Sequence, residues 1–366
     1  MKRIKQKIWI VSFFLIILFP SIIYPFVRGE RDEENRENRN VNEKPIFSPD
    51  NMETYPSAYE AYYNDHIPFR NTLIKMNSYL DYYVFHESPN QDVVVGKDGW
   101  LFYAGKEDGV PIRQAVGKTY YTEEELAAIS DNIAEMRREI ENRGMEFLIF
   151  IAPNKERIYG ENLPEYYGGT TGDTSTEQLI AYLRENTDVN IIFAYEEMMK
   201  QKELHPELFF YYHLDTHWNN AGGYVGASVL LKELGCSLPD IEQVKVEKQL
   251  LSSGDLSNMM NMGIPNGETD YKISGYNELE TECVKCDFST EFIYHTQGAD
   301  PRKLFVYRDS FMTAMFPYVV PSFEDSYMVN ATYYTPEMLE EQKADIFVLE
   351  IVERHLKNLA DINLIE

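Results

Sequence analysis

The sequence predicts an α/β protein whose central parallel sheet is covered by helices on both faces. Three observations support this prediction. Short apolar runs alternate along the chain with amphipathic stretches of helical periodicity. These runs are nearly continuous, which is typical of strands that are buried on both faces of a parallel sheet. The length of 366 residues and the apolar fraction of 44% are enough for one large core or two smaller ones.

Charge and cysteine content exclude several classes of protein. The chain has 34 basic and 60 acidic residues, so its formal net charge is −26. This excess disfavours nucleic acid or an anionic lipid surface as the main partner. Three cysteines are too few for a disulfide scaffold, and the pair Cys283 and Cys286 is no four-ligand zinc site. We expect that pair to form a local disulfide or to stay as two thiols, and we expect Cys236 in the core.

The N-terminal residues 1–28 have the pattern of a membrane signal anchor. Residues 8–27 carry no charge, and they follow a basic start made of Lys2, Arg3, Lys5 and Lys7. Twenty helical residues, at about 1.5 Å each, span a hydrocarbon core of about 30 Å. No small-x-small cleavage site follows, which favours an uncleaved anchor over a cleaved signal peptide. We expect a single-pass protein of the cell membrane with its remainder extracytoplasmic, or a secreted protein if the segment is cleaved.

Three further segments follow the anchor. Residues 29–44 have no aromatic or aliphatic side chain except Val41, and they predict a charged, solvated linker over 29–55. Residues 56–118 predict an extension, with two aromatic-rich helices broken near Pro68 and a hairpin around Lys97-Asp98-Gly99. Residues 119–366 contain the alternating strands and helices of the α/β domain.

The first helix of this domain is predicted over 122–143. Thr122 and Glu125 form a capping box, apolar residues recur on one stripe, and Gly144 ends the helix. The same reasoning predicts further helices over 174–186, 220–234 and 311–319, and strands over 146–151, 190–194, 303–307 and 345–352.

Ser310 is a candidate nucleophile. It follows the strand 303–307 and precedes a helix, so its hydroxyl lies at the carboxyl edge of the sheet, where α/β proteins gather their reactive groups. Free N–H groups at the start of the helix can stabilise a developing oxyanion. Helix capping is the structural alternative for such a serine.

The second candidate feature is the alternating series His213, Asp215 and His217. In an extended segment these three side chains share one face. Asp215 can orient the ring of His217, which then deprotonates Ser310. Alternatively, all three residues can ligate a zinc-like ion, or they can belong to a polar turn before the helix 220–234.

The sequences Asp215-Thr216-His217-Trp218-Asn219 and Arg308-Asp309-Ser310-Phe311 resemble the paired motifs of the SGNH-hydrolase-like family of alginate O-acetylation proteins. They also resemble the related Gram-positive family named for its Asp-His-His-Trp motif. The resemblance extends from about residue 57 to the C-terminus and includes the stretches 95–103, 152–155 and 350–354. It implies a three-layer α/β/α, flavodoxin-like fold in which the motif order is circularly permuted.

The resemblance also implies roles for individual residues. Ser310 becomes the nucleophile, His217 the general base and acid, and Asp215 the carboxylate that orients the ring. The further candidates for oxyanion or substrate contacts are Asn154, Tyr159, Trp218 and Arg308. Two positions depart from the family pattern. Thr216 replaces a histidine, which is harmless if its side chain points away from the triad, and Arg308 replaces a glycine, which strains the turn if the turn needs a positive φ.

The implied function is that of a serine-dependent O-acetyltransferase or acetylesterase for an exported or cell-surface polysaccharide. It needs no metal or other cofactor, and its implied partner is a multi-pass membrane O-acyltransferase. Two alternatives stay open. One is a metal-dependent hydrolase that uses His213, Asp215 and His217, and the other is an inactive glycan-binding assembly protein.

Overall fold

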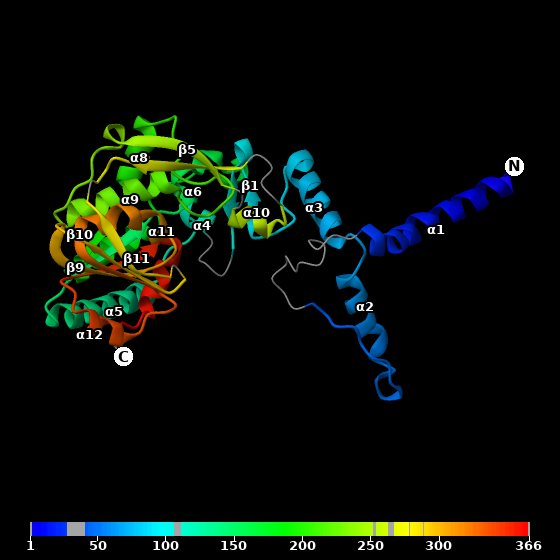
Figure 1. The fold of residues 1–366 in the computed structure, drawn as a ribbon, viewed down its shortest axis with the longest axis horizontal. Coiled ribbons are helices and arrows are strands. Elements are labelled where there is room, and N and C mark those ends of the chain that lie inside the picture. The colour runs from blue at the N-terminus through cyan, green and yellow to red at the C-terminus, as the bar shows by residue number, and fades with distance from the viewer. Residues whose placement is uncertain are drawn as a thin grey trace. The chain divides into compact units, whose positions relative to one another are not determined.

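The computed structural model describes residues 2–27, 41–105, 111–251, 254–262, 267–277, 279–287 and 289–364 (Figure 1). The chain forms two compact units, which are Met1–Pro89 with Asn258–Met262, and Asn90–Ser257 with Gly263–Glu366. The predicted hairpin, which the sequence placed with the extension, lies in the second unit. Residues 29–40 of the predicted linker lie outside the described residues, and residues 41–55 belong to the first unit.

The first unit is helical. Its helices are α1 (Lys2–Val27), α2 (Tyr55–Asp65) and α3 (Arg70–Leu80), with short turns η2 (Pro49–Asn51) and η3 (Asp81–Phe85). The predicted break between the two aromatic-rich helices is present, and Phe69 adopts a φ of 61° there. Among the described residues, no helix has the length and apolarity that a membrane crossing requires. Several side chains of α1, 16–18 among them, lie outside the described residues, so the anchor stays a prediction.

The second unit is built on a seven-stranded sheet in the order β4-β3-β11-β9-β10-β8-β7. The strands are β3 (Glu146–Ala152), β4 (Asn190–Phe193), β7 (Thr281–Asp287), β8 (Glu291–Thr296), β9 (Asp300–Arg308), β10 (Phe323–Asn330) and β11 (Ile346–Val352). The five strands from β4 to β10 are parallel, which confirms the predicted parallel sheet. Strands β8 and β7 add an antiparallel edge, which the sequence analysis did not predict.

Helices cover both faces of this sheet, so the unit has three layers (Figure 1). One face carries α5 (Glu123–Asn142), α7 (Ser175–Asn186), α12 (Pro336–Gln342) and η9 (Glu353–Ala360), and the other carries α8 (Tyr195–Leu204), α9 (Asn220–Glu233) and α11 (Met312–Val319). Alternate residues of β3 enter the two cores, as the pleat of a strand requires. Those facing α5 are Phe147, Ile149 and Ile151, and those facing α9 are Leu148, Phe150 and Ala152.

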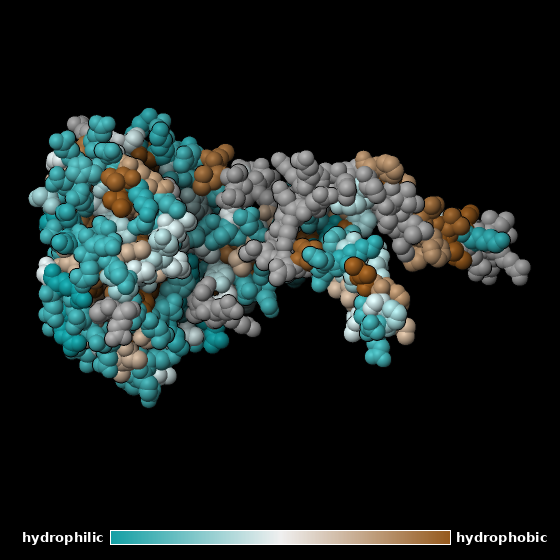
Figure 2. All heavy atoms as spheres, turned by 60° about the horizontal axis from the view of Figure 1, so that its bottom comes forward, coloured by the Kyte–Doolittle hydropathy of each residue, from teal (hydrophilic) through white to brown (hydrophobic). Residues whose placement is uncertain are grey.

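Small elements complete the second unit. Two antiparallel pairs form, β1 (Val93–Val95) with β2 (Leu101–Tyr103) and β5 (Lys245–Leu251) with β6 (Glu268–Ser274). The short helices are α4 (Pro111–Ala115), α6 (Lys155–Ile158), α10 (Asp255–Met259), η4 (Lys97–Gly99), η5 (Gly160–Asn162), η6 (Glu165–Tyr167), η7 (Ile241–Gln243) and η8 (Val320–Ser322). The surface of this unit is mainly hydrophilic in the view of Figure 2.

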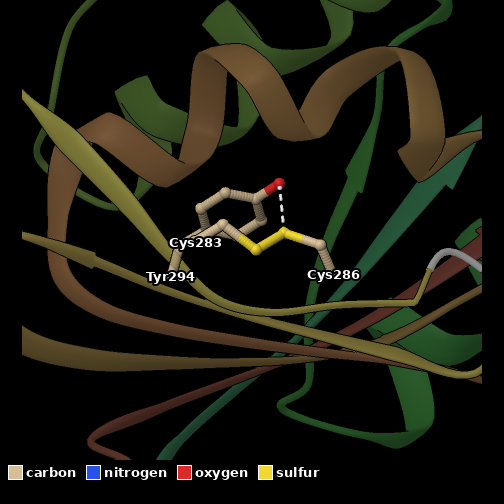
Figure 3. The surroundings of a disulfide bond; sticks show 3 residues. All are labelled: Cys283, Cys286 and Tyr294. Atoms are coloured by element: carbon tan, nitrogen blue, oxygen red, sulfur yellow. Dashed lines mark hydrogen bonds between the residues drawn. A yellow bond between two sulfur atoms is a disulfide. The ribbon is translucent and has the colours of Figure 1, made fainter.

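Cys283 and Cys286 form a disulfide within the edge strand β7 (Figure 3). Residues three apart normally face opposite sides of a strand. Here the pairing register with β8 shifts between Cys283 and Lys285, so Val284 is an extra residue that brings both sulfur atoms to one side. The Tyr294 hydroxyl of β8 lies 3.2 Å from the sulfur of Cys286. Of the two alternatives from the sequence, the disulfide is therefore the one that forms.

A buried carboxylate joins three elements at the carboxyl edge of the sheet. Glu353 is fully buried and accepts hydrogen bonds from the Asn154 N–H at 2.8 Å, the Thr176 hydroxyl at 2.7 Å and Arg157 Nη1 at 2.9 Å. Arg157 is itself buried. We therefore expect Glu353→Ala to lower the free energy of unfolding by about 3 kcal/mol or more, because it leaves buried donors without an acceptor.

Urea unfolding of the purified protein measures this change. Glu141→Ala is the matched control, because Glu141 pairs with Arg137 at the surface and such pairs contribute about 1 kcal/mol or less. Equal losses in the two variants would contradict the structural role of Glu353.

Candidate active site

The structure brings Ser310, His217 and Asp215 into one hydrogen-bonded row. His217 Nε2 lies 2.7 Å from the Ser310 hydroxyl oxygen, and His217 Nδ1 lies 2.7 Å from Asp215 Oδ1. Because the carboxylate only accepts, Nδ1 donates to it, and Nε2 is then the nitrogen that accepts the serine proton. Ser310 is exposed, so a substrate can reach it. This is the arrangement of a nucleophile, a base and an orienting carboxylate.

The turn that presents Ser310 is held by Asp309. Its carboxylate accepts the Phe311 N–H at 2.7 Å and the Val352 N–H at 2.7 Å, and its own N–H donates to Glu350 at 2.9 Å. Burial, and then the nearby Asp309 charge, raise the pKa of Glu350 well above its usual value. These bonds tie the turn after β9 to the end of β11, which fixes the main chain on both sides of the nucleophile.

The Asp215 carboxylate is held by main-chain donors as well as by the ring. It accepts the His217 N–H at 2.9 Å and the Asp255 N–H at 2.8 Å. Burial alone would raise the pKa of Asp215, but the hydrogen bonds and charge of His217 outweigh burial and lower the pKa to about 2. Asp215 is therefore ionised at neutral pH, as an orienting carboxylate must be.

Asp255 is a site residue that the sequence analysis missed. Its carboxylate accepts the Thr216 N–H at 2.7 Å and the Thr216 hydroxyl at 2.5 Å, and it lies 3.6 Å from His217 Nδ1. Gly254 permits this approach, because a Cβ there would lie 2.3 Å from the Leu214 carbonyl oxygen. Asp255 is 40 residues from Asp215, so no local periodicity points to it.

Thr216 does not point away from the triad. Its hydroxyl lies 3.3 Å from His217 Nδ1 while it donates to Asp255. The replacement of histidine by Thr216 was expected to be harmless only if this side chain pointed away from the triad, and it does not. Instead, Thr216 links the ring of His217 to a second carboxylate.

A buried lysine holds the backbone of the same loop. Lys155 is fully buried at the start of α6, and its Nζ donates to the carbonyls of Tyr212 at 3.1 Å, His213 at 3.2 Å and Asp215 at 2.6 Å. Burial lowers the pKa of Lys155 to about 8. The three N–H donors of the ammonium thus bind three carbonyls, and these bonds fix the backbone of the segment that carries Asp215.

The three residues of the predicted metal site do not gather. The Nδ1 atom of His213 lies 3.4 Å from Glu268 Oε1, and the His213 ring centre lies 4.1 Å from that of Trp100. Among the described residues, the group whose ligand atoms lie within 4.8 Å of one another is Asp215, His217 and Asp255. The carboxylate oxygens of Asp215 and Asp255 already accept hydrogen bonds from N–H and O–H groups, and His217 Nδ1 donates to Asp215. These bonds favour the triad over cation binding.

Asn154 occupies the position expected of an accessory residue. It follows β3, separated from the strand of Ser310 by β11 alone, and both strands end at the same edge. Its side chain is fully buried, and its Nδ2 and Oδ1 have no hydrogen-bond partner among the described residues. A buried side-chain amide without hydrogen bonds lowers the stability of the fold, unless a ligand atom forms a hydrogen bond with it.

The other three accessory candidates are buried and pack inside the protein. Trp218 donates from Nε1 to the Phe311 carbonyl at 2.8 Å, which joins the two triad segments. The Tyr159 hydroxyl accepts the Phe210 N–H at 2.9 Å. Arg308 ends β9 in extended backbone, so the strain expected without a glycine does not arise, and its guanidinium lies 4.7 Å from the Phe292 ring. The hydrogen bonds of Trp218 and Tyr159 and the packing of Arg308 on Phe292 indicate positioning roles.

The shifted pKa of Lys155 predicts a pH dependence of stability. Its folded pKa of about 8 lies below the usual value of 10.5, so between these values the unfolded chain binds more protons. The free energy of unfolding should therefore rise with pH across this window, by up to about 3 kcal/mol from this group. Below pH 8 both states are protonated, and the destabilising effect of the buried charge is fully present.

Urea unfolding of the wild type and Lys155→Met between about pH 7 and pH 11 isolates this contribution, because every other group titrates in both proteins. We expect the wild type to gain stability relative to the variant as pH rises. A stability difference that stays constant with pH would contradict the buried ammonium.

The family model described as "SGNH hydrolase-like domain, acetyltransferase AlgX" matches residues 93–286, slightly more than half of the chain. The "Probable alginate O-acetylase AlgJ" of Pseudomonas aeruginosa is 26% identical over 196 residues, which cover 52% of this chain and 44% of that protein. The protein of the same name from Azotobacter vinelandii is 27% identical over 218 residues, which cover 56% and 50%. The chain thus spans about half the length of these curated relatives.

Two solved structures have a similar fold. Bacillus cereus PatB1, solved with a sulfonyl adduct, has a TM-score of 0.55 and 14% identity over 75% of this chain and 98% of its own. A DHHW family protein from Eubacterium siraeum has a TM-score of 0.53 and 16% identity over 76% and 99%. The three-layer fold and the family match agree. The chain belongs to the family of SGNH hydrolase-like domains typified by the acetyltransferase AlgX.

Proposed function

We propose that this chain is a serine-dependent O-acetyltransferase or acetylesterase for an exported or cell-surface polysaccharide. The observation that carries the proposal is the row Ser310–His217–Asp215, with both hydrogen bonds at 2.7 Å. The description of the family as an acetyltransferase domain supports the reaction type. Relatives named alginate O-acetylases support a polysaccharide as the substrate.

The geometry accounts for both halves of the reaction. His217 Nε2 removes the proton from Ser310 as the oxygen attacks the acetyl carbonyl, and then gives that proton to the departing oxygen of the donor. The acetyl group is now an ester of Ser310. A sugar hydroxyl or water next attacks this ester, with His217 as the base, and the proton returns to the serine oxygen. Transfer and hydrolysis differ only in the attacking oxygen.

Asp215 and Asn154 have distinct parts in this proposal. Asp215 keeps the proton on Nδ1 of His217 and stabilises the imidazolium that forms. Asn154 has a buried amide Nδ2 with no partner among the described residues, at the same sheet edge as Ser310. We assign this group as a donor to the oxyanion.

We also propose that the N-terminal segment anchors the protein in the cell membrane, with the second unit outside. The basic start and the 20 uncharged residues 8–27 support this location. A multi-pass membrane O-acyltransferase is then the proposed partner that supplies acetyl groups. Membrane fractionation of the full chain, beside a form that starts at about residue 45, tests the anchor.

Hydrolysis of 4-nitrophenyl acetate by the purified protein tests the triad. Ser310→Ala and His217→Ala should each lower kcat by about 10⁴-fold or more, and Asp215→Asn by about 10³–10⁴-fold, because the asparagine stabilises the wrong tautomer. His295→Ala is the matched control, since His295 pairs with Asp325 away from the triad.

Wild-type rates in the three triad variants would refute the proposal. A chelator should leave the rate unchanged. Loss of activity with chelator and its recovery with zinc would instead favour a metal centre at Asp215, His217 and Asp255.

A further inference from the structure

A cavity of about 240 Å³ lies between the N-terminal end of α5 and the turn η9 that follows β11. Its wall includes Arg354 and Lys357 from η9, Glu125 from the first turn of α5, and Tyr120 and Tyr121 from the segment before α5. Its volume is below the roughly 300–1,000 Å³ of sites for drug-sized ligands. The cavity therefore suits a single sugar residue of a longer chain.

Arg354 connects this cavity to the catalytic row. Its guanidinium carbon lies 5.2 Å from the centre of the Phe311 ring, and Phe311 directly follows the nucleophile. The same ring lies 5.1 Å from the ring of His217. Arg354 and His217 thus both contact the buried ring of Phe311, the residue after the nucleophile.

The Arg354 guanidinium forms no ion pair or hydrogen bond with any other described residue. Acidic residues outnumber basic ones by 60 to 34 in this chain, so carboxylates are abundant. Five other arginines of the same unit are paired with them, namely Arg137, Arg138, Arg143, Arg157 and Arg302. The exposed Arg113 and Arg184 form no ion pair with a described residue. A half-buried guanidinium that stays unpaired in so acidic a protein keeps its planar set of donors available for a ligand.

The remaining wall of the cavity is polar. Gln114 Oε1, Thr119 Oγ1 and Ser175 Oγ are buried oxygens with no hydrogen-bond partner among the described residues, and all three residues line this cavity. Lys357 and Glu125 pair with each other at 2.6 Å, so the Lys357 charge is offset within the wall. The half-exposed ring of Tyr120 offers a face on which a sugar can stack.

We infer that this cavity is the polysaccharide subsite of the enzyme, and that Arg354 binds two neighbouring oxygens of one pyranose, either a carboxylate or a pair of vicinal hydroxyls. The inference rests on the proposed function, because it gives the sugar a place beside Ser310. A planar guanidinium matches both oxygen pairs with two parallel hydrogen bonds. Binding here holds the glycan while a hydroxyl of the same or the next residue faces the acetyl-serine.

Direct binding separates this inference from the chemistry. The parent protein is the full chain with Ser310→Ala, which binds but does not react. Calorimetry measures its dissociation constant for hexasaccharides of mannuronate, of β-1,4-linked glucose and of N-acetylglucosamine. Adding Arg354→Ala should weaken the binding of at least one of these sugars about tenfold or more, the loss of one charge-assisted bidentate contact.

Two further variants make the test specific. Arg354→Lys keeps the charge but not the planar pair of donors, so it should recover only part of the affinity. Arg184→Ala removes an exposed arginine of α7 outside the cavity and should leave the dissociation constant unchanged. Because Arg354→Ala also removes a contact with Phe311, Gln114→Ala provides a second variant of the wall, for which we expect a severalfold loss.

The change in affinity of the Arg354→Ala variant identifies the bound group. Loss confined to the mannuronate sugar identifies a carboxylate as the bound group, and loss for a neutral sugar identifies vicinal hydroxyls. Unchanged affinities in Arg354→Ala and Gln114→Ala, or no binding of any of the three sugars by the parent, would overturn the subsite. Failure of the proposed function shows separately, as esterase activity that survives Ser310→Ala.

Discussion

The parallel pairing of β3, β11 and β9 is the constraint on which the whole site depends. Parallel strands end at one edge, so the segments that follow them, which carry Asn154, Glu353 and Ser310, emerge side by side although they are far apart in sequence. Main-chain hydrogen bonds then join them, from Val352 to Asp309 and from Asn154 to Glu353. Ser310 and Glu353 emerge at the same edge because of the strand order and not because of local sequence.

Buried polar groups give the site its rigidity. Lys155, Glu350 and Glu353 are removed from water, which is unfavourable unless each finds partners. Lys155 finds three carbonyls of the loop before His217. Glu353 finds three donors, two at the start of α6 and one on α7. Because these partners belong to segments that carry the candidate catalytic residues, the hydrogen bonds that offset burial also fix the geometry of the site.

Local signals predicted most of the secondary structure of the second unit. The capping box at Thr122 and Glu125 forms as expected, and the helix it begins ends at Asn142. The buried strands at 146–152 and 346–352 are apolar enough to be recognised. Five strands were missed, namely 245–251, 268–274, 281–287, 291–296 and 323–330. Those at 245–251 and 281–287 are largely exposed and mix charged with apolar residues. Their pairing comes from neighbouring strands, so their own sequence carries little signal.

The sequence by itself determined the local elements, the position of Ser310 at a strand-to-helix turn and the set of polar side chains that precede α9. It left three uses open for His213, Asp215 and His217, because spacing alone does not say where a side chain points. The tertiary structure decided among them. It directs His213 to Glu268 and His217 to Ser310, and it adds Asp255 from a segment with no local signature. The physical reason is that strand order and loop packing decide which distant side chains meet. Both depend on contacts across the entire chain and not on local sequence.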